Sequence, residues 1–195
     1  MHLSSYEHMA GLIKKYLDSD LPQTIIDVGS YDVNGSYRPL FSQPNWRYIG
    51  ADLVAGPNVD VVLTSPYRLP FASYSADIIV SGQAFEHMEF FWLTWLDMVR
   101  VLKLDGLIFL IAPSRGPEHR HPVDCWRFYP DGFAALARYG ALELLEVHTD
   151  WVPHHEPASA PWGDTVGVFR KPRIGKLARI RYWIMHHIRH LLIPW

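Results

Sequence analysis

The sequence predicts one α/β domain, in which a mostly parallel β-sheet is covered by helices on both faces. Short apolar runs rich in Val and Ile recur along the chain, and segments of helical periodicity lie between them, which is the order that gives parallel sheets. The chain has 195 residues, 49% of them hydrophobic, which is enough for one well-buried core and too little for two.

The first part of the chain supplies helices and five strands. Apolar residues at helical spacing predict an opening helix over residues 3–17, which ends before Pro22. Apolar runs predict strands over residues 24–28, 48–52, 59–63, 76–81 and 106–112, the last of them ended by Pro113. A helix is expected directly after the first strand, and another over residues 90–102.

The second part supplies a helix and two more strands. A helix that runs through Tyr139 is predicted after Pro130-Asp131-Gly132, and strands are predicted over residues 142–147 and 165–169. The connection between these strands is rich in Pro and His and contains no helix, whereas a parallel crossover usually needs one. We therefore expect the last two strands to be antiparallel.

Charge divides the chain into a body and a tail. The formal net charge is −2, yet seven of the 18 Lys and Arg residues, and none of the 20 acidic residues, follow Asp164. We therefore divide the chain into a domain over residues 1–172 and a basic amphipathic helix over residues 173–195. Its apolar stripe consists of Leu177, Ile180, Ile184, Ile188 and Leu191. The tail is expected to cover the body, to pair with a second copy in a homodimer, or to lie on a membrane surface. Because the body is acidic, nucleic acid is not expected as a partner.

Cysteine use and hydropathy indicate the cellular location. The single cysteine, Cys125, excludes an internal disulfide and is typical of a reducing compartment. The first residues lack the pattern of a secretory signal, and no apolar run approaches the ~20 residues that a membrane-spanning helix needs. The sequence therefore indicates a cytoplasmic protein, with any membrane contact peripheral and through the tail.

A loop with a glycine and an acidic strand end indicate a nucleoside site. Residues 27–35 follow the first predicted strand, and Gly29 lets the chain pass close to a ligand. Asp52 ends the second strand, where a carboxylate can accept hydrogen bonds from two ribose hydroxyls. A nicotinamide dinucleotide would use such a carboxylate as well, but the chain lacks a compact Gly-x-Gly-x-x-Gly loop and a recognisable hydride-transfer set.

Four segments in the right order resemble the class I S-adenosylmethionine-dependent methyltransferases, especially small members of the methyltransferase-11 type. Residues 26–30 resemble the family's glycine motif, and residues 49–53 its acidic loop. Residues 69–87 resemble its Leu-Pro-Phe…Glu-His run, and residues 99–107 its Arg-Val-Leu-Lys-Pro-Gly-Gly signature. The resemblance covers roughly residues 20–172. It implies a Rossmann-like sheet of seven strands, mostly parallel with an antiparallel last strand, and S-adenosylmethionine as the cofactor.

The resemblance also assigns residues to the cofactor. These are Asp27, Gly29, Ser30, Tyr31, Gly35, Asp52, Leu53, Ser65 and Gly82. The chain departs from the family pattern at two of them. Tyr31 stands at the second glycine of the usual motif, and Ser65 stands about where the family often has an aspartate that contacts adenine. These departures change the contacts that the loop can make.

Histidines at the carboxyl ends of the predicted strands are candidates for the general base of methyl transfer. Methyl transfer to an aliphatic hydroxyl needs a base or a metal ion, because the hydroxyl ionises far above pH 7. His119 and His121 follow the fifth strand and are candidate bases, with Asp124 as the residue that orients one of them. His87, after the fourth strand, is an equal candidate. The group of His119, His121 and Asp124 could instead hold a divalent ion, although Mg²⁺ prefers carboxylates. A loop held by hydrogen bonds and an ion pair of Arg127 is the purely structural alternative.

Other polar and aromatic residues are assigned to the acceptor: Glu86, Arg115, Trp126, Arg127, Tyr129, Trp151 and His154. The pattern His-x-His-Pro-x-Asp-x-Trp-Arg-Phe-Tyr-Pro resembles methyltransferases associated with glycan and polysaccharide biosynthesis. The sequence thus predicts O-methylation of a sugar or glycan hydroxyl with a histidine base. A small carboxylate or phenol is the alternative acceptor. A non-catalytic binding module, whose tail binds a membrane or a partner, is the alternative class of protein.

Overall fold

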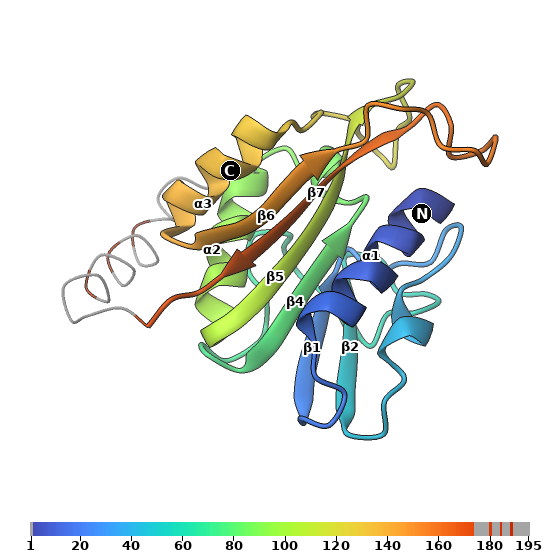
Figure 1. The fold of residues 1–195 in the computed structure, drawn as a ribbon. Helices are drawn as coiled ribbons and strands as arrows, with labels where there is room; N and C mark the ends of the chain where they lie inside the picture. The colour runs from blue at the N-terminus through green and yellow to red at the C-terminus, as the bar shows by residue number, and fades with distance from the viewer. Residues whose placement is uncertain (1, 174–179, 181–183, 185–187, 189–195) are drawn as a thin grey trace.

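A mixed sheet of seven strands forms the centre of the protein, in the order β3-β2-β1-β4-β5-β7-β6 (Figure 1). The computed structural model describes residues 2–173 together with residues 180, 184 and 188. The strands are β1 (Gln23–Val28), β2 (Trp46–Asp52), β3 (Val61–Val62), β4 (Ala76–Gly82), β5 (Leu102–Arg115), β6 (Glu143–Thr149) and β7 (Gly163–Arg170). β1 to β5 pair in parallel, whereas β7 is antiparallel to both of its neighbours, β5 and β6. The predicted seven-stranded fold with an antiparallel last strand is confirmed.

Helices cover both faces of the sheet, as predicted (Figure 1). They are α1 (Leu3–Tyr16), α2 (Phe91–Val101) and α3 (Pro130–Gly140). Successive strand residues point to opposite faces, so Ile25 and Ile26 of β1 enter different cores. Ile25 belongs to the core under α1 together with Met9, and Ile26 belongs to the core under α2 and α3 together with Trp95.

The connection between β1 and β2 differs from the prediction. Residues 29–45, all of which the structure describes, contain the 3₁₀ helix η1 (Arg38–Phe41) and no α-helix. Pro39 sits at the start of η1, and Pro44 follows it. Proline lacks a backbone donor and restricts the residue before it, so an α-helix cannot run through this segment. The expected helix after the first strand was therefore wrong.

Strand β5 runs through Pro113, where the prediction ended it. Pro113 pairs with Asp164 of β7 at a point where the register shifts before Arg115. A proline is tolerated at such an irregularity because the ladder does not need its missing donor there. The Pro113 carbonyl accepts a hydrogen bond from the backbone N–H of Phe128 at 2.9 Å, which ties the end of β5 to the segment before α3.

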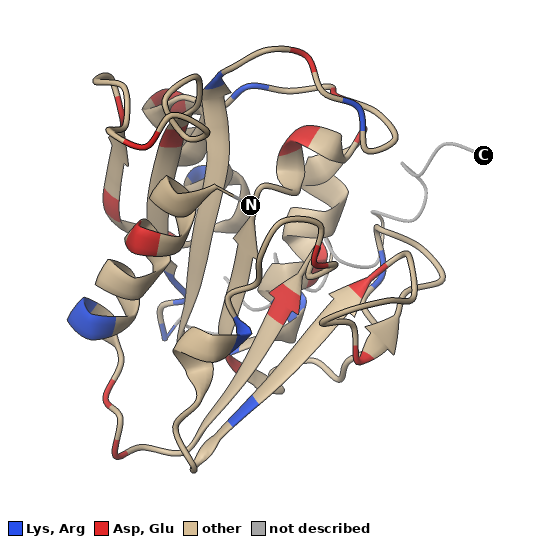
Figure 2. Cartoon of the chain, turned by 90° about the vertical axis from the view of Figure 1, so that its right-hand side faces the viewer, with Lys and Arg blue, Asp and Glu red and all other residues tan. Residues whose placement is uncertain are grey.

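The predicted tail over residues 173–195 lies largely outside the described residues. Ile180, Ile184 and Ile188 are described, and each is about half exposed. Among the described residues, no helix has both the length and the apolar character needed to cross a bilayer. In Figure 2 the Lys and Arg residues of the coloured part are dispersed over several elements. The expectations about a membrane surface, a second copy and nucleic acid stay predictions.

Candidate active site

A cavity of about 770 Å³ lies beyond the carboxyl ends of β1, β2 and β4. Its walls come from the loops that follow these strands and from the segment after β5. Eight of the nine residues assigned to the cofactor line it: Asp27, Gly29, Ser30, Tyr31, Gly35, Asp52, Leu53 and Gly82. Ligands of open α/β sheets bind at this edge, so the cavity is the candidate active site.

The turn at Gly29 brings backbone close to the loop after β4. Gly29 has φ +83°, and a Cβ built on it would overlap the Cβ of Ala84. Its N–H donates to the Ala51 carbonyl at 2.9 Å, which fixes the turn beside β2. A residue with a side chain would be strained in its backbone and would collide, so this position requires glycine.

The Asp52 carboxylate is held at the cavity wall by backbone donors. Its Oδ2 accepts from the N–H of Tyr31 at 2.9 Å, and its Oδ1 accepts from the N–H of Val54 at 3.3 Å. Each carboxylate oxygen can accept a second hydrogen bond. The arrangement therefore fits a ligand with two neighbouring hydroxyls, such as a ribose.

Asp27 lies deeper, at the end of β1. It is almost fully buried and accepts a hydrogen bond from the Tyr48 hydroxyl. Burial raises the pKa of Asp27 to about 7, and the nearby Asp52 raises it further, while Tyr48 and Arg38 oppose the shift. Near neutral pH the site can therefore hold Asp27 with or without its proton.

One cofactor assignment needs correction, and one has a structural reason. Ser65 does not line the cavity; its Oγ accepts from the N–H of Tyr67 at 3.2 Å, and the cavity wall is formed by Pro66 and Tyr67 instead. Gly82 does line it, but a Cβ there would overlap the Tyr37 hydroxyl. The lack of a side chain at Gly82 is thus explained by the Tyr37 ring, which the sequence analysis did not place at the site.

Three histidines meet on the other side of the cavity, as predicted for the acceptor side. His87, His119 and His121 all line it, and their ring centroids are 4.8, 5.7 and 5.8 Å apart. The Nδ1–H of His87 donates to the Val123 carbonyl at 2.6 Å, which leaves Nε2 with its lone pair. Burial lowers the pKa of both His87 and His119, and the ring of His121 lowers the pKa of each further, so the neutral imidazoles are favoured.

Glu86 lies beneath this cluster and not in the cavity wall, which corrects its assignment to the acceptor. The side chain is fully buried, and its Oε1 is 3.6 Å from the Nε2 of His87. Burial raises the pKa of Glu86 to about 8. Among the described residues, neither carboxylate oxygen has a hydrogen-bond partner. A buried polar group without a partner is rare in folded proteins.

Asp124 holds its loop together and is not in the cavity wall. Its two oxygens accept from the Arg127 guanidinium at 2.5 and 2.8 Å, and Oδ2 also accepts from the N–H of His119 at 2.8 Å. The Arg127 guanidinium holds the pKa of Asp124 well below its usual range. This is the ion pair named above as the structural alternative. Asp124 still lies 3.3 Å from the Nδ1 of His119, close enough to orient that ring.

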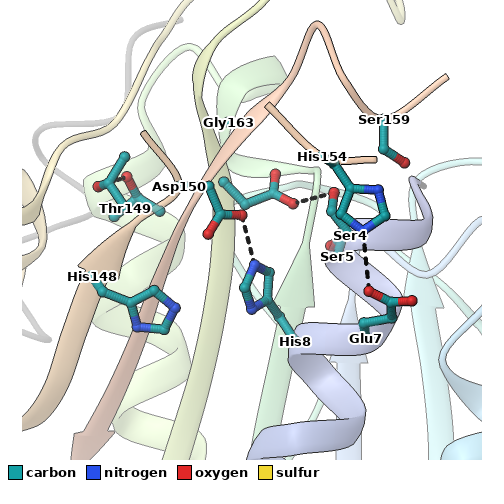
Figure 3. A network of polar contacts seen from close by, with 12 residues as sticks. Ser4, Ser5, Glu7, His8, His148, Thr149, Asp150, His154, Ser159 and Gly163 are labelled. Atoms are coloured by element: carbon teal, nitrogen blue, oxygen red, sulfur yellow. Dashed lines mark hydrogen bonds and ion pairs between the residues drawn. The ribbon is translucent and has the colours of Figure 1, made fainter. Parts of the chain in front are cut away.

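The remaining acceptor assignments do not converge on the cavity: Arg115, Trp126, Tyr129, Trp151 and His154 are absent from its wall. The rings of Tyr129 and Trp151 stack on each other at the surface; their centroids are 6.1 Å apart and their planes are nearly parallel. The indole of Trp126 donates to the Met88 carbonyl at 3.0 Å. Figure 3 shows His154 directed at Glu7 of α1, at 3.1 Å. These side chains have partners of their own, which sequence spacing could not reveal.

The start of α1 is fixed beside the cavity and supplies residues that the sequence analysis missed. Ser4 donates to the Asp164 carboxylate of β7 at 2.9 Å, a contact drawn in Figure 3. Gln83 of the cavity wall donates to the same carboxylate at 2.8 Å. His2 also lines the cavity. The N-terminal helix therefore contributes to the site through contacts across more than 150 residues of sequence, which no local pattern signals.

Sequence comparisons connect the chain to methyltransferases. A profile of the family described as a methyltransferase domain matches residues 27–110. An uncharacterized methyltransferase of Mycobacterium tuberculosis (strain ATCC 25177 / H37Ra) is 33% identical over 129 residues, 60% of this chain and 50% of the relative. One of Mycobacterium leprae (strain Br4923) is 29% identical over 160 residues, 74% of this chain and 58% of the relative. The chain thus spans about half the length of the curated relatives it matches.

Comparison with solved structures shows a likeness of fold. The 1,6-didemethyltoxoflavin-N1-methyltransferase of Burkholderia thailandensis, solved with 1,6-didemethyltoxoflavin and S-adenosylhomocysteine, superimposes with a TM-score of 0.67. The match covers 87% of this chain and 79% of that chain, at 18% sequence identity. At this identity the likeness is one of fold.

Proposed function

We propose that the chain is a class I S-adenosylmethionine-dependent methyltransferase, which its domain match over residues 27–110 and its fold support, and that it methylates a hydroxyl group of a sugar or glycan. One observation carries the proposal. A single cavity joins the Gly29 turn and the Asp52 carboxylate to a cluster of three histidines. A cofactor cradle and candidate bases therefore face a common space.

The residues present fit the cofactor. The close backbone approach at Gly29 leaves no room for a side chain, and the Asp52 carboxylate keeps acceptor capacity toward the cavity. S-adenosylmethionine, when bound, supplies an electrophilic methyl group and carries a positive charge. Asp27 and Asp52 lie on the same wall, and carboxylates favour a cation near them. Gly29 and Asp52 are the residues we expect to hold the cofactor.

A base is needed for an aliphatic hydroxyl, and we assign this role to His121. Its ring lines the cavity, and no hydrogen bond of its side chain to another described residue is found. His87, by contrast, is held by the Val123 carbonyl, and His119 lies against Asp124. A free ring nitrogen of His121 can accept the hydroxyl proton while the hydroxyl oxygen keeps the electron pair for attack. Imidazole at the acceptor side also supports a polar acceptor over an apolar one.

Calorimetry tests the cofactor half of the proposal. We expect S-adenosylmethionine and S-adenosylhomocysteine to bind the full chain, and Asp52→Asn to weaken binding about tenfold to a hundredfold, since charged hydrogen bonds contribute about 1.5–3 kcal/mol. Asp20→Asn, at an exposed loop carboxylate, is the matched control and should leave binding unchanged. Absence of binding at millimolar cofactor would overturn the proposal.

Turnover with a methyl-labelled cofactor tests the acceptor half. Monosaccharides and nucleotide sugars are compared with phenols and small carboxylates, and label is expected in the sugars. His121→Ala should lower turnover about 10²- to 10⁴-fold, the usual contribution of a general base. His155→Ala, an exposed histidine outside the cavity wall, is the control. Full turnover of His121→Ala would contradict the base assignment, and label found only in phenols or carboxylates would replace the acceptor class.

A further inference from the structure

The cluster beneath the cavity contains buried polar atoms that the proposed function does not use. Glu86 is 0% exposed, and neither of its carboxylate oxygens has a hydrogen-bond partner among the described residues. Leaving such oxygens unpaired is unfavourable, and more so when they carry a charge. A ligand that satisfies them would explain why they persist.

The geometry of the cluster suits a small cation. One ligand atom each from Glu86, His87 and His119 lies within 4.8 Å of the other two. The Oε1 of Glu86 and the Nε2 of His87 are 3.6 Å apart. Two ligands at about 2.1 Å from a tetrahedral ion are separated by about 3.4 Å. The pair is therefore almost at the spacing that a shared ion would impose.

The surroundings of the two histidines match those of metal ligands. His87 donates its Nδ1–H to the Val123 carbonyl at 2.6 Å, so Nε2 is the atom free to coordinate. The Nδ1 of His119 lies 3.3 Å from the Asp124 carboxylate, which Arg127 holds in place. Histidines that bind metals usually direct their other ring nitrogen at a carbonyl or carboxylate, which fixes the tautomer and the ring orientation.

We propose that Glu86, His87 and His119 bind one divalent transition-metal ion at the acceptor side of the cavity. Two imidazoles favour zinc or a similar transition metal over Mg²⁺, which prefers oxygen ligands. Three protein ligands leave a coordination position open toward the cavity, because His87 and His119 both line it. The set differs from the sequence hypothesis, in which Asp124 was a ligand, since Asp124 is paired with Arg127.

The role of the ion rests on the proposed function. An acceptor hydroxyl on the open position would lose its proton more readily, because a bound cation stabilises the alkoxide. The O–H bond breaks, the proton passes to the ring of His121, and the oxygen retains the electron pair. Binding of the ion itself does not depend on which acceptor is used.

A second group of residues requires a control. His8, His148 and Asp150 also present three ligand atoms within 4.8 Å of one another. There the Nε2 of His8 and Asp150 already form a hydrogen bond at 2.7 Å (Figure 3). All three are partly exposed, and they lie at α1 and the end of β6 instead of at the cavity. A His148→Ala variant separates binding at that surface from binding at the proposed site.

The test is a Zn²⁺ titration of the metal-free full chain by calorimetry with a competing chelator. In the His148→Ala background we expect one equivalent of Zn²⁺ to bind. Adding Glu86→Gln or His119→Ala should weaken that binding at least tenfold, whereas binding of S-adenosylhomocysteine should stay unchanged and report an intact fold. Absorption spectra with Co²⁺ should show four-coordinate bands that both substitutions remove.

Two results would overturn the site: no Zn²⁺ bound in the His148→Ala background, or unchanged Zn²⁺ affinity in both Glu86→Gln and His119→Ala. The readouts also separate this inference from the proposed function. Zn²⁺ binding without methylation of any sugar would support the metal site and count against the sugar acceptor. Methylation that persists in the chelator-treated protein, with no Zn²⁺ bound, would leave the proposed function standing and overturn the role of the ion in deprotonating the acceptor.

Discussion

The Asp27→Asn substitution is expected to remove a loss of folding stability that the natural chain undergoes as the pH rises. Burial raises the pKa of Asp27 from 3.8 to about 7. Between these values the unfolded chain has released the proton while the folded protein still holds it, so each rise in pH favours the unfolded state. A difference of about three pKa units corresponds to about 4 kcal/mol over the whole range, and to about 3 kcal/mol between pH 5 and pH 8. Asparagine has no proton to lose, and its carbonyl can still accept from the Tyr48 hydroxyl.

Urea denaturation at pH 5, 6, 7 and 8 checks this expectation. The stability of Asp27→Asn relative to the natural chain should rise with pH by about 3 kcal/mol and level off above pH 7–8. Asp20→Asn, at an exposed carboxylate, controls for the general effect of removing a negative charge. A difference between Asp27→Asn and the natural chain that is constant from pH 5 to pH 8 would show that Asp27 titrates normally, and would refute the reasoning.

Two further predictions follow from the loops of the cavity. Gly29→Ala places a methyl group against Ala84 in a left-handed backbone conformation. The substitution should destabilise the fold by about 1–3 kcal/mol and weaken the binding of S-adenosylhomocysteine. An unchanged melting temperature and unchanged binding would contradict this account of the turn. Arg127→Met leaves the Asp124 carboxylate, 2% exposed, without its partner, and should destabilise the protein by about 3–5 kcal/mol in urea denaturation. The same change should lower Zn²⁺ affinity about tenfold, because His119 loses its fixed neighbour.

The sheet was predictable because its signals are local. Val and Ile runs marked β1 and β4, and the lack of a helix before β7 indicated its antiparallel direction. The helix expected after β1 from the usual strand-to-helix order is absent from residues 29–45, where Pro39 and Pro44 interrupt the segment. Pro113 likewise predicts the end of a strand, whereas a shift in register accommodates it within β5.

The site was predictable where it is built from the ends of neighbouring strands. Gly29 and Asp52 sit at strand ends, so the topology alone brings them to one edge. The acceptor side depends instead on which partner each side chain finds. Asp124 could have oriented a histidine or paired with Arg127, and only the folded loop decides between them. Tyr37 and Gln83, which line the cavity, contact Ser5 of α1, a helix that carries no motif.

The buried carboxyl of Glu86 gives a last prediction, in which stability and function oppose each other. In chelator-treated protein, Glu86→Met should raise the free energy of unfolding by about 1–3 kcal/mol, because an apolar side chain of similar length replaces a buried group without a partner. For a chain of this size, thermal melting should rise by roughly 2–4 °C for each kcal/mol. Zn²⁺ should then stabilise the natural chain but not the variant. Glu89→Met, at an exposed neighbour, should change stability by no more than about 0.5 kcal/mol. A lower melting temperature for Glu86→Met would mean that the carboxyl already makes favourable contacts in the metal-free fold. A residue that weakens the empty protein and strengthens the loaded one is placed for a ligand.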